Sequence, residues 1–119
     1  MKHNNDFRHD LEFGQMSETK FHKMLSQKKV EVKSDKQSMV TGNVFIEFES
    51  RGKLSGISTT EADYYAYYIN DETCITMSVK TLKVKLKKLY KEKKAIVRPG
   101  GDENTSMGLV VKIKDLLHD

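Results

Sequence analysis

The chain has 119 residues, which is enough for one domain with a modest hydrophobic core. Charged residues make up 32% of it, and no apolar run approaches the roughly 18 residues that a membrane-spanning helix needs, so a membrane protein is excluded. The N-terminal residues are polar, so we expect no secretory signal and a cytoplasmic location. The formal net charge of +4 fits a polyanionic partner and an ordinary solvated lysine-rich surface equally well.

The first nine residues are expected to form a flexible tail, and residues 10–119 a single domain. Apolar residues then recur at spacings of three to four, which predicts an amphipathic helix over residues 11–27. These residues are Leu11, Phe13, Met16, Phe21, Met24 and Leu25. Glu18 lies on the border of their stripe.

Two segments with period-two alternation follow, and we expect them to pair as a β-hairpin. In the first segment, Val30 and Val32 alternate with Glu31, Lys33 and Asp35. In the second segment, Val44, Ile46 and Phe48 alternate with Glu47 and Glu49.

The rest of the chain predicts further elements around this hairpin. Ser58, Thr59 and Thr60 are good N-cap residues for a short helical turn. Residues 64–69 and 73–79 favour a second strand pair that carries the single cysteine, Cys74, in or near the core. A lysine-rich helix, a long turn over residues 97–108 and a last strand over residues 108–113 complete the order, which predicts an α/β (α+β) fold with a mixed central sheet flanked by helices.

The hairpin would place four carboxylates and one lysine on a single face. Like charges that lie opposite one another destabilise a sheet, so a cation is expected there. Mg²⁺ prefers oxygen ligands and is commonly held by one or two carboxylates together with waters and a substrate phosphate. The alternative is that the charges only keep one face of an edge hairpin solvated.

The order of a helix Glu, a strand Asp and a Glu-x-Glu on the next strand resembles the PD-(D/E)XK nuclease superfamily. The string "VEVKSD…TGNVFIEFESRGKLSGISTTEADYY" is similar to small, mostly phage-encoded members of it. The resemblance implies a restriction-endonuclease-like core that hydrolyses nucleic-acid backbones with Mg²⁺. Mn²⁺ is expected to substitute for Mg²⁺. If the protein is phage-encoded, it would act in the cytoplasm of the host cell.

Residue roles follow from the same resemblance. Asp35 and Glu47 would hold the metal with the backbone carbonyl of Phe48, and Glu49 would take the usual lysine position and orient or deprotonate the attacking water. Glu18 would anchor a second metal or a water, and Lys33 would touch the scissile phosphate. An alternative register takes Glu31 and Lys33 as the Glu-x-Lys pair and lacks a metal-binding Asp on a preceding strand.

Nucleic-acid contacts are expected from residues near the catalytic strands, namely Lys36, Arg51, Lys53, Ser58, Thr59 and Thr60. The leading hypothesis is a Mg²⁺-dependent endonuclease that acts on DNA, on linear or branched substrates, with RNA left open as a substrate and a two-fold dimer as a plausible assembly. The alternative hypothesis is a non-catalytic nucleic-acid-binding or protein-interaction module that keeps the nuclease fold.

Overall fold

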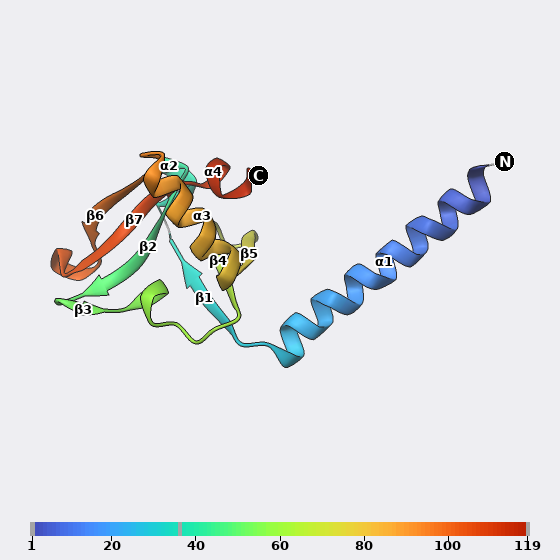
Figure 1. Ribbon diagram of the computed structural model, residues 1–119, viewed down its shortest axis with the longest axis horizontal. Coiled ribbons are helices and arrows are strands. Elements are labelled where there is room, and N and C mark those ends of the chain that lie inside the picture. The colour runs from blue at the N-terminus through green and yellow to red at the C-terminus, as the bar shows by residue number, and fades with distance from the viewer. Residues whose placement is uncertain (1, 36, 119) are drawn as a thin grey trace.

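The computed structural model describes the backbone of residues 2–35 and 37–118, and the side chains of these ranges from residue 9 onwards. It is a mixed α+β fold with two sheets (Figure 1). The described helices are α1 (Lys2–Gln27), α2 (Ser38–Thr41), α3 (Val79–Lys91) and α4 (Ile113–Leu117), with 3₁₀ turns η1 (Gly56–Ser58) and η2 (Asp102–Asn104). No helix in the described ranges combines the length and apolarity needed to cross a bilayer.

The strands divide between a three-stranded and a four-stranded sheet, in place of the single mixed sheet that the sequence predicted. The first sheet has the order β1 (Val30–Ser34), β4 (Tyr64–Tyr68), β5 (Cys74–Ser78). The second has the order β3 (Lys53–Leu54), β2 (Asn43–Ser50), β7 (Ser106–Lys112), β6 (Ala95–Gly100).

The expected hairpin between β1 and β2 does not form. β1 pairs in parallel with β4, whereas β2 pairs antiparallel with β7 and β3. The reason lies between the two strands, where the single turn of α2 ends at Gly42 in the left-handed conformation, with φ of 71°. Glycine adopts this conformation without a steric penalty, and the chain is thereby redirected into the other sheet.

A hydrophobic core joins the two sheets to α3. The lysine-rich helix is confirmed, and it buries Val79, Leu82, Leu86 and Leu89 at helical spacing. Ser78 caps its N-terminus by accepting a hydrogen bond from the Thr81 amide at 3.1 Å. The partners of this face are Val44 and Ile46 of β2, Ile57 of η1, Tyr65 of β4, Ala95 of β6, Val111 of β7 and Leu116 of α4.

Several local predictions change in the structure. The β4–β5 pair is confirmed, but Cys74 is exposed at its outer strand. The turn predicted over residues 97–108 is short, because β6 runs on to Gly100 and β7 begins at Ser106. Pro99 is tolerated within β6 because that strand is the edge of its sheet.

Helix α1 projects away from the rest of the domain (Figure 1), and the molecule measures 61 × 29 × 28 Å. It begins at Lys2, so it includes residues 2–9, for which the sequence predicted a flexible tail. Among the described side chains of α1, only Met24 is buried. The predicted helix is therefore present, but its apolar side chains do not pack on the domain.

Candidate functional site

A cleft between the two sheets brings together part of the predicted site. Two adjoining hollows, of about 210 and 630 Å³, form it and share Phe45, Tyr67 and Gly101 as lining residues. Lys33 and Glu47 line the smaller hollow, and Asp35 lines the larger one. We call these two hollows the inter-sheet cleft.

One wall of the cleft comes from the parallel pair of strands. Glu31 lies opposite Tyr65 in the register, and Lys33 lies opposite Tyr67. Because side chains two residues apart share a face of a strand, all four belong to the same face of this sheet. The hydrogen bond from the Asp35 amide to the Tyr68 carbonyl, at 3.2 Å, extends the ladder and holds Asp35 at the end of this wall.

The opposite wall is β2, and three glycines allow its close packing. A Cβ atom on Gly100 or Gly108 would lie 2.7 or 2.5 Å from the Phe45 ring, so the ring fits only against glycine. Gly56, with φ of 54°, packs in the same way against the backbone carbonyl of Glu47. This packing fixes the position of Glu47 in the cleft.

A polar network surrounds Glu31. Its carboxylate forms an ion pair with Lys33 at 2.8 Å and accepts a hydrogen bond from the Thr60 hydroxyl at 2.9 Å. Burial opposes ionisation of Glu31, but the bonds from Lys33 and Thr60 outweigh it and lower the pKa of Glu31 below its usual value. Thr60 therefore binds this carboxylate and does not cap a helix as expected, since η1 ends before it.

The depressed pKa of Glu31 makes a prediction for acid stability. A carboxyl group whose pKa is lower in the folded state stabilises the fold above its unfolded pKa, and this stabilisation is lost as the pH falls through the folded pKa. Between about pH 5 and about pH 3, the wild type should therefore lose more unfolding free energy than Glu31→Gln, as measured by urea titrations at each pH. Equal losses in the two proteins would contradict the lowered pKa.

Two tyrosines lie at the centre of the cleft. The Tyr67 hydroxyl donates to the Phe45 carbonyl at 2.6 Å and so ties the two sheets together. The Tyr65 hydroxyl is buried and has no hydrogen-bond partner among the described residues, although Glu31 and Thr60 lie close enough to affect its pKa. Burial, followed by the charge of Glu31, raises the pKa of Tyr65 to about 12. Burial and then the charge of Asp35 raise the pKa of Tyr67 to about 12, which places both phenols in their neutral form.

Removal of the Tyr67 hydroxyl and removal of the Tyr65 hydroxyl should have different effects on the stability of the protein. Tyr67→Phe leaves a carbonyl without its partner and should lower the unfolding free energy by about 1 to 2 kcal/mol. Tyr65→Phe removes a buried hydroxyl that has no partner, so the stability should stay constant or rise slightly. Urea denaturation of both variants tests this, and a larger loss for Tyr65→Phe would mean that its hydroxyl does have a partner.

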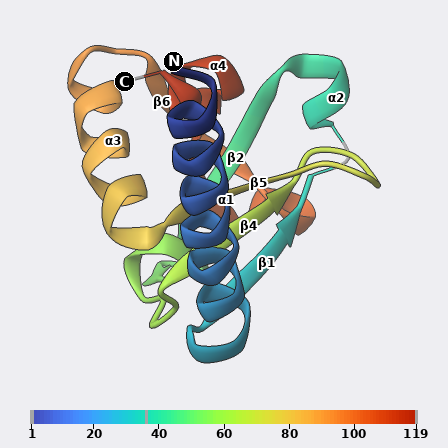
Figure 2. The same cartoon turned by 90° about the vertical axis from the view of Figure 1, so that its right-hand side faces the viewer.

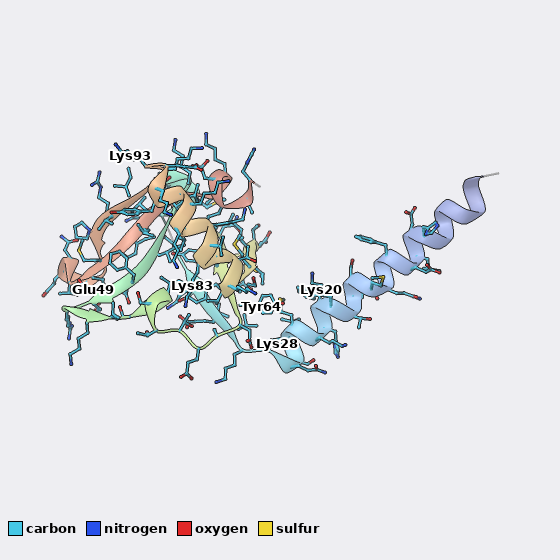
Figure 3. The ribbon with its side chains drawn as sticks, viewed as in Figure 1. Lys20, Lys28, Glu49, Tyr64, Lys83 and Lys93 are labelled. Atoms are coloured by element: carbon cyan, nitrogen blue, oxygen red, sulfur yellow. The ribbon has the colours of Figure 1, made fainter. Side chains whose placement is uncertain are left out.

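The remaining predicted catalytic residues lie outside the cleft. Glu18 is exposed on α1, which runs away from the sheets (Figure 1). Glu49 follows an irregularity in the pairing of β2 with β7, next to β3, and does not line either hollow. Figure 3 shows Glu49 near the C-terminal end of β2. The Phe48 carbonyl, expected as a metal ligand, accepts hydrogen bonds from the Ser55 amide at 3.0 Å and the Ser58 hydroxyl at 2.8 Å.

The predicted nucleic-acid contacts are spread over several places. Arg51 and Lys53 are exposed at the turn from β2 to β3, and Ser58 and Thr59 are exposed at the end of η1. Lys36 lies outside the described residues. Of the described residues in this set, Thr60 alone contacts the polar network beside the cleft, through its bond to Glu31.

Sequence reasoning missed three contributors to the cleft, namely Phe45, Tyr65 and Tyr67, and it considered Ser55 only as a phosphate contact. Ser55 donates to the Glu47 carboxylate at 2.9 Å. The tyrosines carried a signal, because their alternate positions in "YYAYY" place them on one face of a strand. Phe45 carried none, since only the packing of β2 against the glycines brings it to the cleft.

The geometry also bears on the expected metal site. Within the described ranges, no three His, Cys, Asp or Glu side chains come together in a group that could hold a metal ion. One carboxylate oxygen of Asp35 accepts a hydrogen bond from the Gln37 amide at 2.9 Å. One carboxylate oxygen of Glu47 accepts from the Ser55 hydroxyl. The second oxygen of each carboxylate makes no hydrogen bond among the described residues. Two carboxylates of this kind match the donor set of a Mg²⁺ ion that is completed by water and phosphate.

Comparisons with family models, with curated proteins and with solved structures give no match for this chain.

Proposed function

We propose that this protein is a Mg²⁺-dependent endonuclease that hydrolyses DNA in the inter-sheet cleft. The observation that supports it best is that Lys33 and Glu47, from strands of different sheets, line the smaller hollow of the cleft, while Asp35, directly after β1, lines the larger one. These are two carboxylates and one ammonium group, the set that a phosphodiester hydrolase needs to hold a metal and a phosphate. The restriction-endonuclease-like character of the core is part of the same proposal.

Each residue has a defined task in this proposal. Asp35 and Glu47 would hold the metal through their unused oxygens, and Ser55 would orient the Glu47 carboxylate. Mg²⁺, when bound, would lower the pKa of a water and offset the charge of the reacting phosphate. Lys33 would exchange its partner Glu31 for a phosphate oxygen, while Thr60 continues to satisfy Glu31.

Tyr65 and Tyr67 would shape the cleft without exchanging protons. With pKa values of about 12, both phenols stay neutral at physiological pH and do not act as bases. The Tyr65 hydroxyl is buried beside Glu31 and has no hydrogen-bond partner among the described residues, so it would donate to a carboxylate or phosphate oxygen that reached it in the hollow. The net charge of +4 would assist the approach of a polyanion.

The test is cleavage of a panel of substrates by the wild-type protein. The panel holds duplex, single-stranded and four-way-junction DNA with a matched RNA, each incubated with Mg²⁺, with Mn²⁺ and with EDTA. We expect cutting that requires the metal and is strongest on one DNA form. Absence of cutting in every metal-containing lane would overturn the proposal, and preferred cutting of RNA would change its substrate.

A second candidate is a nucleic-acid-binding module without catalysis. The observation that favours it is that Lys33 is neutralised by Glu31 and that, among the described residues, only two carboxylates, those of Asp35 and Glu47, line the cleft. A module of this kind should bind DNA with unchanged or raised affinity after Asp35→Ala, because the change removes a negative charge near the polyanion. Gel-shift titrations with the same panel, with and without metal, distinguish the two candidates.

A further inference from the structure

Helix α1 exposes large apolar side chains that have no cover in the described molecule. Phe13 and Met16 are 72% and 70% exposed, respectively. They are three residues apart and therefore share one face of the helix. Asp10 and Glu12 flank this face, since Asp10 precedes Phe13 by three residues and Glu12 precedes Met16 by four. We call Asp10, Glu12, Phe13 and Met16 the arm face.

A groove of about 560 Å³ lies between α3 and the four-stranded sheet. Its apolar lining includes Phe48, Leu54, Ile57, Leu86, Val97 and Leu109. Leu54 is 68% exposed there. Lys83 and Lys87, four residues apart on the same side of α3, also line the groove. An apolar hollow with a basic border suits an apolar segment with acidic flanks.

The charges of the two surfaces are complementary. Residues 9–19 of α1 contain Asp10, Glu12 and Glu18 and no lysine or arginine, and the first lysine after them is Lys20, four residues beyond Met16. The groove has two lysines on its border, and no acidic residue lines it. Burial of Phe13 and Met16 would supply apolar contact, and the flanking carboxylates would set the register against the lysines.

The helix of one molecule is directed away from the groove of the same molecule. Only two residues separate α1 from β1, and the second of them is anchored. The Lys29 amide donates to the Asp63 carboxylate at 2.9 Å, and the Lys29 carbonyl accepts from the amides of Asp63 and Tyr64. These bonds hold the start of β1 where the chain leaves α1. Figure 1 shows α1 projecting away from β1, β4 and β5, and Figure 2, viewed from that side, shows it in front of the strands.

We propose that the arm face docks into the groove of a second copy of this chain, and that the exchange is reciprocal. Two copies related by a two-fold axis would each supply one arm and one groove, which closes the assembly at a dimer. Phe13 and Met16 would lie on Leu54, Leu86 and Leu109, with Asp10 and Glu12 facing Lys83 and Lys87. The proposal does not depend on nuclease activity.

The test is the mass of the full-length protein in solution, measured by sedimentation equilibrium over a range of concentrations. We expect a monomer–dimer equilibrium in the wild type. Phe13→Ser with Met16→Ser should raise the dimer dissociation constant by at least about tenfold, because both anchors are lost. A wild type that stays monomeric at about 100 μM would overturn the proposal, since a biological dimer is expected to form well below this concentration.

A charge exchange identifies the surfaces. Asp10→Lys with Glu12→Lys should weaken the dimer, as should Lys83→Glu with Lys87→Glu, and a protein that carries all four changes should regain much of the wild-type affinity. Lys93→Glu is the matched control, because Lys93 is exposed beyond the other end of α3 (Figure 3). All five positions are exposed, so circular dichroism should show wild-type folding.

Two results would overturn the docking arrangement. If the dimer forms but Lys83→Glu with Lys87→Glu leaves its affinity unchanged, α1 pairs with another surface, such as a second α1. If the protein with all four changes dimerises no more tightly than either protein with two changes, the acidic flanks do not face these lysines.

Discussion

Glu47→Gln is expected to reduce metal-dependent cleavage by at least about a thousandfold while the protein stays folded. The change removes the charge that a metal ion would need, yet it keeps the shape of the side chain and an oxygen that accepts from Ser55. The measurement is the single-turnover rate on the preferred DNA substrate in Mg²⁺.

Glu49→Gln provides a matched control, because the same change is made two residues further along the same strand. Glu49 lines neither hollow of the inter-sheet cleft, so its rate should remain within about threefold of wild type, as for a surface charge distant from the reacting phosphate. Equal large losses in the two variants would contradict the cleft as the site and favour the Glu-x-Glu motif that the sequence indicated.

Gly56→Ala is expected to be strongly destabilising, with a loss of more than about 3 kcal/mol in unfolding free energy. Two effects combine here. The φ of Gly56 is 54°, which disfavours any side chain, and an added Cβ would overlap the backbone carbonyl of Glu47. The contact is with backbone, so no side-chain rotation relieves it.

Gly52→Ala separates these effects. Gly52 has φ of 79° with nothing within 4 Å of an added Cβ, so it carries the conformational cost without the overlap. Its loss should be about 1 kcal/mol. Urea denaturation of both variants measures the difference, and similar losses would mean that Glu47 can shift away from the added methyl group.

Local patterns predicted much of the secondary structure, because the relevant signals lie within each segment. Leu82, Leu86 and Leu89 indicated α3, and the aromatic run indicated β4. Pairing is a different matter, since alternation shows that a segment is a strand and does not show its neighbour. The hairpin expected between β1 and β2 was wrong for this reason: β1 lies beside a strand 34 residues later in the chain, with Val30 opposite Tyr64.

The candidate site shows the same division. Lys33, Asp35 and Glu47 could be chosen from the sequence because their residue types and their positions in or next to alternating segments are visible there. In the structure Lys33 and Glu47 line the smaller hollow of the cleft and Asp35 lines the larger one. Tyr65, Tyr67 and Ser55 reach the cleft only through contacts between segments distant in sequence. The sequence could not show that Glu18 lies outside the site. The position of α1 relative to β1 depends on the bonds that Lys29 makes with Asp63 and Tyr64.

The pairing of β2 with β7 has a consequence for folding. Val44 of β2 lies opposite Val111 of β7, so the strand that carries Glu47 obtains its main partner from a segment more than 60 residues later. Forming such distant contacts requires closing a large loop before any stabilisation is gained, and this slows folding. During synthesis, β2 has only the two-residue strand β3 beside it until residues 106–112 have left the ribosome. An unpaired apolar strand is prone to aggregation over this interval, so the yield of folded protein should depend on expression temperature and chaperone supply.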